Sequence, residues 1–210
     1  NATDPELNSK GIDLDSTWLI TADDRVALTY EYLKTGYKAI PAIAGNPDYS
    51  AAGLQALATQ EGLAGFTAAN AAELSAGLTA TMNAFVGAQL QNAPVNSFTI
   101  DYQHIFRLPG GGQLTPHVAG VYKTKYWSFG GAPGANVSGI LADSSSSDLA
   151  WQQAYSKWDV SLEWQSADGK FDINYYVKNA TNEVVMANYA GQYVSLEAPR
   201  TVGVVFNAHL

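Results

Sequence analysis

Apolar and polar residues alternate on both sides of an Asp-Gly pair in the last third of the chain. Every second residue is apolar in 158–164, before the pair, and again in 171–177, after it. Successive side chains of a β-strand point to opposite faces of a sheet, so each segment has one apolar and one polar face. Asp168 and Gly169 can supply the positive φ angles of a tight turn. The pattern therefore predicts an antiparallel hairpin over residues 157–179.

The same period of two recurs in five further segments, which brings the predicted number of strands to about seven. These segments are residues 12–20, 26–32, 98–108, 113–127 and 201–210. Between the second and the third, the composition shifts to Ala, Gly, Leu, Asn and Gln. Within that stretch, residues 50–57 and 67–90 carry helix formers behind a Ser and a Thr, which are good N-cap residues. We therefore expect residues 39–95 to form a long, partly helical insertion, which in compact domains is usually a lid or a binding loop.

The predicted connections alternate between tight and long. The tight ones are 21–24, 109–112 and 166–170, and the long ones are 39–95, 129–149 and 181–196. Transmembrane β-barrels alternate in this way between short periplasmic turns and long outer loops. Aromatic residues gather near the strand ends, as in the interfacial girdles of membrane proteins. They are Trp18, Phe106, Trp164, Phe171 and Phe206 toward the short turns, and Tyr30, Tyr32, Phe98, Tyr126 and Trp158 toward the long loops.

Composition supports a membrane wall and excludes several other classes. Charged residues make up only 14% of the chain, against about 25% in an ordinary soluble domain. No run approaches the roughly 18 apolar residues of a spanning helix, so any membrane segment must be β. The net charge of -8 excludes nucleic acid as a partner, because the chain could not neutralise a row of phosphates. The absence of cysteine excludes a disulfide scaffold and thiolate metal sites.

The titratable residues show no pattern of a catalytic or metal site. Six acids project from the polar strand faces, where acids inside a barrel bond to one another, to water or to a plug; they are Asp13, Asp15, Asp101, Asp159, Glu163 and Asp172. His104, His117 and His209 lie on separate predicted strands, without the spacing of metal ligands. Residues 110–112 are glycines, but the Lys and Ser or Thr of a phosphate-binding loop do not follow them. We therefore expect neither enzymatic activity nor a metal or cofactor.

Aromatic residues in or beside the long connections are the candidate ligand-binding residues, because aromatic rings can stack on a sugar or a chelate. They are Tyr37, Tyr49, Trp127, Phe129, Trp151, Tyr155 and Tyr189. The alternative is that half or more of them pack the loops together or complete the outer aromatic girdle. The sequence indicates the group and does not single out one residue.

Three segments resemble the C-terminal barrel of TonB-dependent outer-membrane receptors. They are GIDLDSTWLITADDRVALTYEYLKT (11–35), SKWDVSLEWQSADGKFDINYYVKNATNE (156–183) and APRTVGVVFNAHL (198–210). The first is similar to the family's Gly-hydrophobic-acidic strand and hairpin, and the second to its penultimate hairpin ending in an Asn-containing tag. The third is similar to its closing Pro-Arg-Thr strand, although Leu210 stands where the family has an aromatic residue.

The resemblance implies an all-β fold, an antiparallel up-and-down transmembrane β-barrel segment with about seven strands of a larger barrel. Residues 1–210 would form the C-terminal portion of that barrel, with residues 39–95 as a partly helical outer loop. The family's N-terminal plug domain and TonB box, and the rest of its about twenty-two strands, are absent from this sequence. Seven strands leave two edges with unpaired backbone groups that lipid cannot satisfy, so further strands are expected to complete the wall.

The implied function is transport: energised uptake of a scarce nutrient, such as an iron-siderophore, a cobalamin or an oligosaccharide. The implied location is the outer membrane of a Gram-negative bacterium. The implied partners are membrane lipid and lipopolysaccharide, the rest of the receptor with its plug, TonB through the N-terminal part, and the small nutrient ligand. Two alternatives remain open: a small self-contained outer-membrane barrel of about eight strands with a structural or surface-interaction role, and a soluble antiparallel β enzyme or sugar-binding sandwich.

Overall fold

A computed structural model describes residues 6–39, 50–128, 151–190 and 193–209. The chain divides into two compact units. Unit 1 consists of residues 1–10, 34–93 and 127–151, and unit 2 of residues 11–33, 94–126 and 152–210. The strand-forming residues predominate in unit 2, and the helices lie in unit 1.

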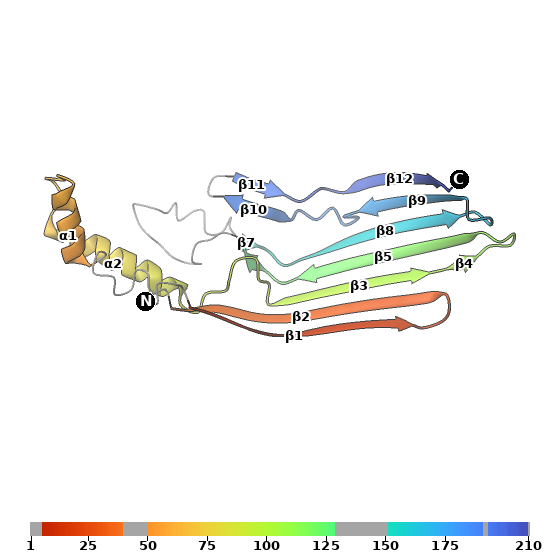
Figure 1. Cartoon of the computed structure of the whole chain (residues 1–210), viewed down its shortest axis with the longest axis horizontal. Coiled ribbons are helices and arrows are strands. Elements are labelled where there is room, and N and C mark those ends of the chain that lie inside the picture. The colour runs from red at the N-terminus through yellow and green to blue at the C-terminus, as the bar shows by residue number, and fades with distance from the viewer. Residues whose placement is uncertain (1–5, 40–49, 129–150, 191–192, 210) are drawn as a thin grey trace. The chain divides into compact units, whose positions relative to one another are not determined.

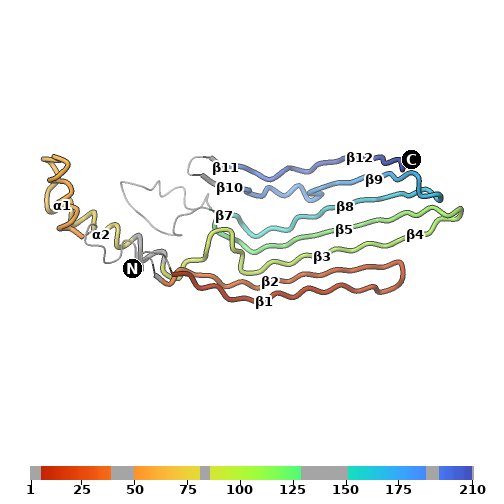
Figure 2. The backbone as a smooth tube through the Cα atoms, viewed as in Figure 1, coloured from red at the N-terminus to blue at the C-terminus, as the bar shows by residue number. Residues whose placement is uncertain are grey.

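One antiparallel sheet contains all seven predicted strands, in chain order (Figures 1 and 2). They are β1 (Glu6–Leu19), β2 (Asp24–Ala39), β3 (Asn96–His104), β5 (Gln113–Lys123), β8 (Tyr155–Gln165), β9 (Phe171–Lys178) and β12 (Thr201–Ala208). A short strand, β4 (Phe106–Arg107), continues the line of β3 and pairs with the start of β5. The sheet order ends at β1 and β12, so the described sheet is an open, up-and-down part of a barrel wall.

The register places the apolar positions of neighbouring strands opposite one another. Ile100 pairs with Leu28 on one side and with Gly120 on the other, and Leu162 pairs with Pro116 on β5 and Tyr175 on β9. The result is an apolar face that crosses the whole sheet, with a polar face behind it. Large apolar side chains on this face stay exposed, as Phe206 does at 61%, so the chain itself does not cover them. This distribution suits a wall whose outer side meets lipid.

Several strand boundaries and one connection differ from the predictions. β1 begins at Glu6 and not at Ile12, and β2 continues to Ala39, beyond the predicted end at Tyr32. The expected loop over 181–196 contains a hairpin of β10 (Met186–Ala190) and β11 (Tyr193–Leu196). Strands of four or five residues are too short to show an alternating pattern, so their pairing could not be seen in the sequence.

Two helices in unit 1 begin where the sequence predicted them. Helix α1 (Ala51–Gln60) starts behind Ser50, whose Oγ accepts a hydrogen bond from Gly53 N at 3.0 Å. Helix α2 (Ala68–Phe85) starts behind Thr67, whose Oγ1 accepts from Asn70 N while Asn70 Oδ1 accepts from Thr67 N. These side chains satisfy backbone donors that a helix start leaves free.

The two helices pack on each other through small and aliphatic side chains. Leu54 and Ala58 of α1 and Ala71 of α2 are buried. Helix α2 ends earlier than the predicted residue 90, because Gly87 has a φ of 82° that an α-helix cannot contain. No helix in the described ranges is long and apolar enough to cross a membrane.

Unit 2 has a small buried cluster near the ends of the strands that lead into the long connections. Tyr126, Tyr155 and Val185 form it, with Val121 packed against them. Tyr126 is only 8% exposed, so its predicted place in the outer girdle is wrong. Its neighbour on the apolar face, Tyr122, is 43% exposed and occupies that position. The departure follows from residues 124–125, where the strand pattern of β5 is interrupted before β6 (Tyr126–Trp127).

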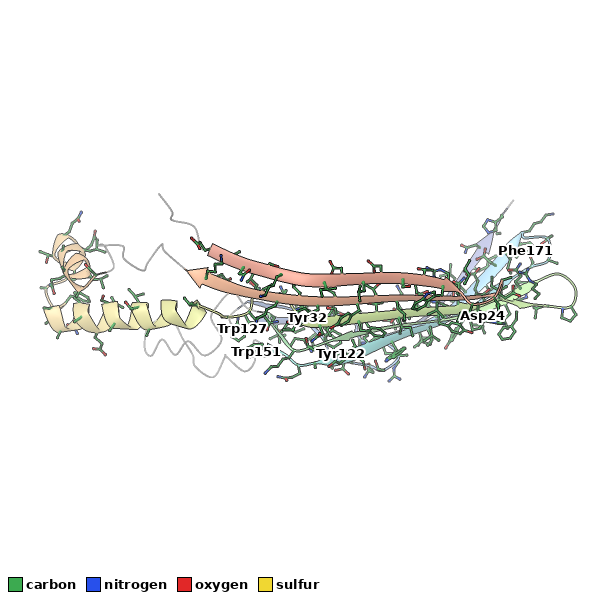
Figure 3. The ribbon with its side chains drawn as sticks, turned by 90° about the horizontal axis from the view of Figure 1, so that it is seen from below. Asp24, Tyr32, Tyr122, Trp127, Trp151 and Phe171 are labelled. Carbon is green, nitrogen blue, oxygen red and sulfur yellow. The ribbon has the colours of Figure 1, made fainter. Side chains whose placement is uncertain are left out.

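The other end of the strands carries the tight turns and is called the short-turn end; the end of the long connections is the long-loop end. At the short-turn end Phe171 and Phe206 stack with ring centroids 6.0 Å apart. Figure 3 shows Asp24 and Phe171 at this end and Tyr32 and Tyr122 toward the other. Apart from Tyr126, the aromatic residues predicted for the two girdles lie on the apolar face of the sheet.

Candidate functional site

A hydrogen-bonded group on the polar face joins three neighbouring strands. Asp101 of β3 accepts a hydrogen bond from Arg25 Nη1 of β2 at 3.0 Å, and its other oxygen lies 2.6 Å from His117 Nε2 of β5. The residues directly opposite Asp101 are Ala27 and Ala119. Because alanine is small, the carboxylate can reach the diagonal neighbours on both sides. These contacts link β2, β3 and β5 across the polar face through side chains that are about one-third exposed.

A shallow hollow of about 500 Å³ lies beside this group on the polar face of β5, β8, β9 and β12. Its lining includes His117, Asp159, Ser161, Asn174, Tyr176 and Lys178. The Asn174 Oδ1 atom is buried and has no hydrogen-bond partner within the described part of the chain. Lys178 Nζ lies 5.7 Å from the centre of the Tyr176 ring, within the range of a cation–π contact. Amide, hydroxyl, carboxylate and ammonium groups together make a surface suited to binding polar groups by hydrogen bonds.

The Tyr176 ring can lie over the neighbouring strand β12 because the residue paired with it there is a glycine. Gly203 of β12 pairs with Tyr176 of β9. A Cβ atom on Gly203 would lie 2.3 Å from the Tyr176 hydroxyl oxygen, so any other residue would displace the ring. The glycine therefore positions the hydroxyl at the edge of the hollow.

Each histidine of the chain has an aspartate as its neighbour. In addition to the His117–Asp101 pair, His104 Nδ1 lies 2.6 Å from Asp24 Oδ1, and His209 Nε2 lies 2.8 Å from Asp172 Oδ1. The sequence shows the three histidines only as residues of separate strands, so these pairs are not apparent in it. Counting residues outward from the 109–112 turn would have placed His117 near Asp101, since a tight turn sets the register of its hairpin. Within the described ranges, no group of three or more His, Asp or Glu could hold a metal ion.

The structure brings two of the predicted ligand-binding aromatics together. Trp127 of β6 and Trp151 of β7 (Trp151–Gln152) meet edge to face, with ring centroids 5.2 Å apart and planes at 70° (Figure 3). Trp127 is 3% exposed, and its buried Nε1 has no partner in the described residues. Tyr37, also in unit 1, lies in β2, where its carbonyl accepts from Gly87 N at 2.8 Å. The tryptophan pair is thus the part of the predicted group with a defined geometry.

For three of the other predicted aromatics the structure describes no side chain, and a fourth, Tyr155, lies in unit 2. Tyr155 belongs to unit 2, where burial raises the pKa of its phenol and that of Tyr126, so both stay neutral. Both lie past the end of the apolar face, which begins at Trp158 in β8. Tyr189 lies in β10, and its side chain is outside the described part. Tyr49 and Phe129 fall outside the described residues altogether.

The 166–170 turn holds an exposed carboxylate with a lowered pKa. Asp168 Oδ1 accepts from Ser166 Oγ at 2.8 Å and from Lys170 N at 3.1 Å, and these bonds lower its pKa below the ordinary value of 3.8, Ser166 having the larger effect. A lowered folded pKa means that the stabilisation is complete above 3.8 and is lost as the pH falls through the folded value.

Ser166→Ala is therefore expected to raise the pKa of Asp168 toward 3.8 and to move the loss of turn stability to higher pH. Titration of the Asp168 carboxyl carbon by NMR in detergent micelles measures the shift. Ser161→Ala is the matched control, since its hydroxyl makes no hydrogen bond with Asp168. An unchanged Asp168 titration in Ser166→Ala would contradict the expectation.

The chain is similar in structure to several solved siderophore receptors. The ferric yersiniabactin uptake receptor FyuA from Yersinia pestis matches 97% of this chain with a TM-score of 0.60 at 12% identity, over 24% of its own length. The siderophore receptor PiuA from Acinetobacter baumannii matches 98% (TM-score 0.58, 15% identity, 22% of its length). The ferric preacinetobactin receptor BauA from the same organism matches 97% (TM-score 0.57, 13% identity, 22% of its length).

No protein-family model and no curated protein sequence matches the chain. At these identities the likeness concerns the fold, and the chain spans about a quarter of the length of the receptors. The order of the strands, their alternating faces and the coverage agree with the predicted architecture. The chain has the fold of a β-barrel portion of a TonB-dependent siderophore receptor.

Proposed function

We propose that the chain supplies barrel wall and outer loops of a TonB-dependent transport receptor that takes up a scarce nutrient across the outer membrane. The cargo class is an iron-siderophore, a cobalamin or an oligosaccharide. The observation that carries the proposal is the seven-stranded up-and-down sheet that matches siderophore receptors over 97% of the chain. In this proposal the receptor lies in the outer membrane of a Gram-negative bacterium, contains a plug and is driven by the TonB protein.

Each face of the sheet supports a part of that role. The apolar face keeps its large side chains exposed, which suits contact with lipid. The polar face carries the Asp101 group and the hollow around Asn174, which suits contact with water, cargo or a plug. Each of the three histidines contacts an aspartate of another part of the sheet, and these contacts link the sheet together. We therefore assign the chain a binding and transport role, and not catalysis.

The described sheet favours a portion of a large barrel over a small self-contained one. Closure within the chain would require β1 to pair with β12, whereas the described strand order ends at these two strands. Unpaired backbone groups at an edge are costly in lipid, so further strands are needed on both sides.

Growth on defined nutrients tests the proposal. The gene that encodes this chain is deleted, and growth is compared with iron supplied as single ferric siderophores, with cobalamin as the limiting cofactor, or with oligosaccharides as the carbon source. We expect the deletion strain to grow more slowly than its parent on one class of cargo. When TonB is removed from both strains, this difference in growth should disappear. A protein that extracts as a water-soluble monomer without detergent would contradict the proposal.

We expect the tryptophan pair to contribute to cargo binding. Trp151→Ala should weaken cargo binding about tenfold, because an aromatic contact in a binding site contributes on the order of 1–2 kcal/mol. Isothermal titration of the detergent-solubilised receptor measures the affinity. Trp164→Ala at the short-turn end is the matched control and should leave the affinity unchanged. Equal cargo affinities of the two variants would contradict a role of the tryptophan pair in cargo binding.

A further inference from the structure

A short segment after α2 is fixed to the far end of β2. It comprises residues 87–93 of unit 1 and is called the strap. Its first residue, Gly87, donates from its backbone N to Tyr37 O at 2.8 Å. Further along, Leu90 N donates to Thr35 Oγ1 at 3.0 Å. The strap therefore follows a defined path along the last residues of β2.

The strap also bonds to the part of the chain that carries Trp127. Asn92 N donates to Trp127 O at 2.7 Å, and Gln91 Nε2 donates to Ser128 O at 2.8 Å. Asn92 has a φ of 55°, in the left-handed region that asparagine adopts more readily than most residues. Trp127 and Ser128 are both buried. Two successive carbonyl groups after β5 are thus held by two successive residues of the strap.

The strand β6 depends on such support because it is very short. β6 and β7 have two residues each and form a separate two-stranded sheet. An isolated pair of strands is marginally stable in water even when the strands are longer. The edge-to-face contact of Trp127 with Trp151 joins the same two strands (Figure 3). Bonds from the strap to this part of the chain therefore help to fix the position of the tryptophan pair.

The side chain of Gln91 contributes to this contact in a way that the path of the strap does not require. Gln91 is exposed, so its amide group could bond to water. Holding a long side chain in one rotamer costs conformational entropy, which a bond to water would not demand. The backbone bonds to β2 already set the path of the strap. The bond from Gln91 to Ser128 therefore acts on the position of β6.

We propose that Gln91 is a positioning residue for the tryptophan pair, and that through it the helical insertion sets the orientation in which Trp151 meets the cargo. The proposal rests on the proposed function, in which the pair contributes to cargo binding. The strap follows directly on α2, which ends at Phe85. Gln91 acts through the backbone of Ser128 and not by contact with the cargo. A polar residue of the insertion thus determines the geometry of an aromatic site that lies more distant in the sequence.

Circular dichroism of the purified full-length receptor in detergent tests the positioning. Two indole rings in contact couple their electronic transitions and give a paired positive and negative band, which is assigned by its loss in Trp127→Phe. Gln91→Ala should lose most of the amplitude of this band. Gln91→Lys should restore it, because lysine again brings an N–H donor to Ser128 O. Gln55→Ala is the matched control, since it also removes a glutamine bond to a backbone carbonyl in unit 1, that to Phe66 O at 3.0 Å, and it should leave the band unchanged.

Cargo binding separates a positioning role from a purely structural one. The probes are a ferric catecholate siderophore, cyanocobalamin and maltohexaose, each titrated separately into the same samples. Gln91→Ala should bind the probe that the original chain binds about fivefold more weakly, as expected for one lost hydrogen bond. Gln91→Lys and Gln55→Ala should bind it like the original chain. Heat-dependent gel migration verifies that each variant is folded.

Three results would overturn the proposal. They are an unchanged paired band in Gln91→Ala, an unchanged affinity of that variant for the probe, or equal losses in Gln91→Ala and Gln55→Ala. An original chain that shows the band and binds none of the three probes contradicts the proposed function and with it the cargo role of the pair. The response of the band to Gln91→Ala then still decides whether Gln91 positions the two rings.

Discussion

Asn179→Ala is expected to lower the free energy of unfolding by about 4 kcal/mol. Asn179 is 3% exposed and has a φ of 50°, a conformation that costs alanine about 1 kcal/mol. Its Nδ2 donates to Glu183 O at 2.8 Å and to Ala198 O at 3.3 Å, and its Oδ1 accepts from Glu183 N at 2.8 Å. Each lost bond costs about 1 kcal/mol, because Asn179 itself is buried and its bonds to the backbone are shielded from water. The side chain thus joins the end of β9 to the segment before β12.

Two variants separate the contributions to this loss. Asn179→Gly keeps the positive φ and removes the hydrogen bonds, so it should be less destabilising than alanine by about 1 kcal/mol. Asn182→Gly is the matched control: Asn182 has a φ of 53° and is exposed, and its Oδ1 accepts one long bond, from Arg200 N at 3.3 Å. Asn182→Gly should lower the free energy of unfolding by less than about 1 kcal/mol. Equilibrium unfolding in guanidinium from lipid vesicles measures all three, and equal losses at positions 179 and 182 would contradict the assignment.

Gly120→Val is expected to lower the free energy of unfolding by about 3 kcal/mol. Gly120 of β5 is buried and pairs with Trp158 of β8, whose indole ring lies across it. A Cβ at position 120 would lie 2.6 Å from Cε3 and Cζ3 of that ring. Overpacking of a filled site costs about 1–3 kcal/mol, and the displaced indole also loses its contact with the sheet. The pair is an aromatic ring that covers a glycine in a neighbouring strand, a device that fixes register.

The same unfolding experiment contains its own control in a double-mutant cycle. In the background of Trp158→Ala the space over position 120 is empty, so Gly120→Val should cost less than about 1 kcal/mol there. Gly65→Val in unit 1 is a second control, since no atom lies within 4 Å of a Cβ at that position. An equal cost in both backgrounds would show that the valine acts through the β5 backbone and not through the indole ring.

The strands and the alternation of tight and long connections could be predicted because they depend on local patterns. The period of two in 158–164 and 171–177 assigns each residue to a face before any partner is known. The tight turn at Asp168-Gly169 then sets the pairing of β8 with β9. The predicted helix starts at Ser50 and Thr67 are likewise local, since an N-cap bonds within its own first turn. The hairpin β10–β11 is too short for such a pattern and was missed.

The candidate site was less predictable, because its contacts join residues far apart in the chain. Arg25, Asp101 and His117 meet only because β2, β3 and β5 lie side by side in one register. The tryptophan pair was named as two members of a larger aromatic group, and its edge-to-face geometry could not be deduced from composition. The position of Tyr126 near a predicted strand end places it in the outer girdle. The interruption after β5 instead directs its side chain toward Tyr155 and Val185 in the buried cluster.

The sequence by itself determined which side chains would be apolar or polar on each strand, because successive residues of a strand must face opposite sides. It also determined the tight turns at 109–112 and 166–170, since glycine and proline there permit or restrict particular backbone angles. Only the tertiary structure decided which residues of different strands became partners, as in Asp101 with His117 and Gly120 with Trp158. The physical reason is that a shift of register by one residue changes every such contact, and register depends on the pairing of whole strands.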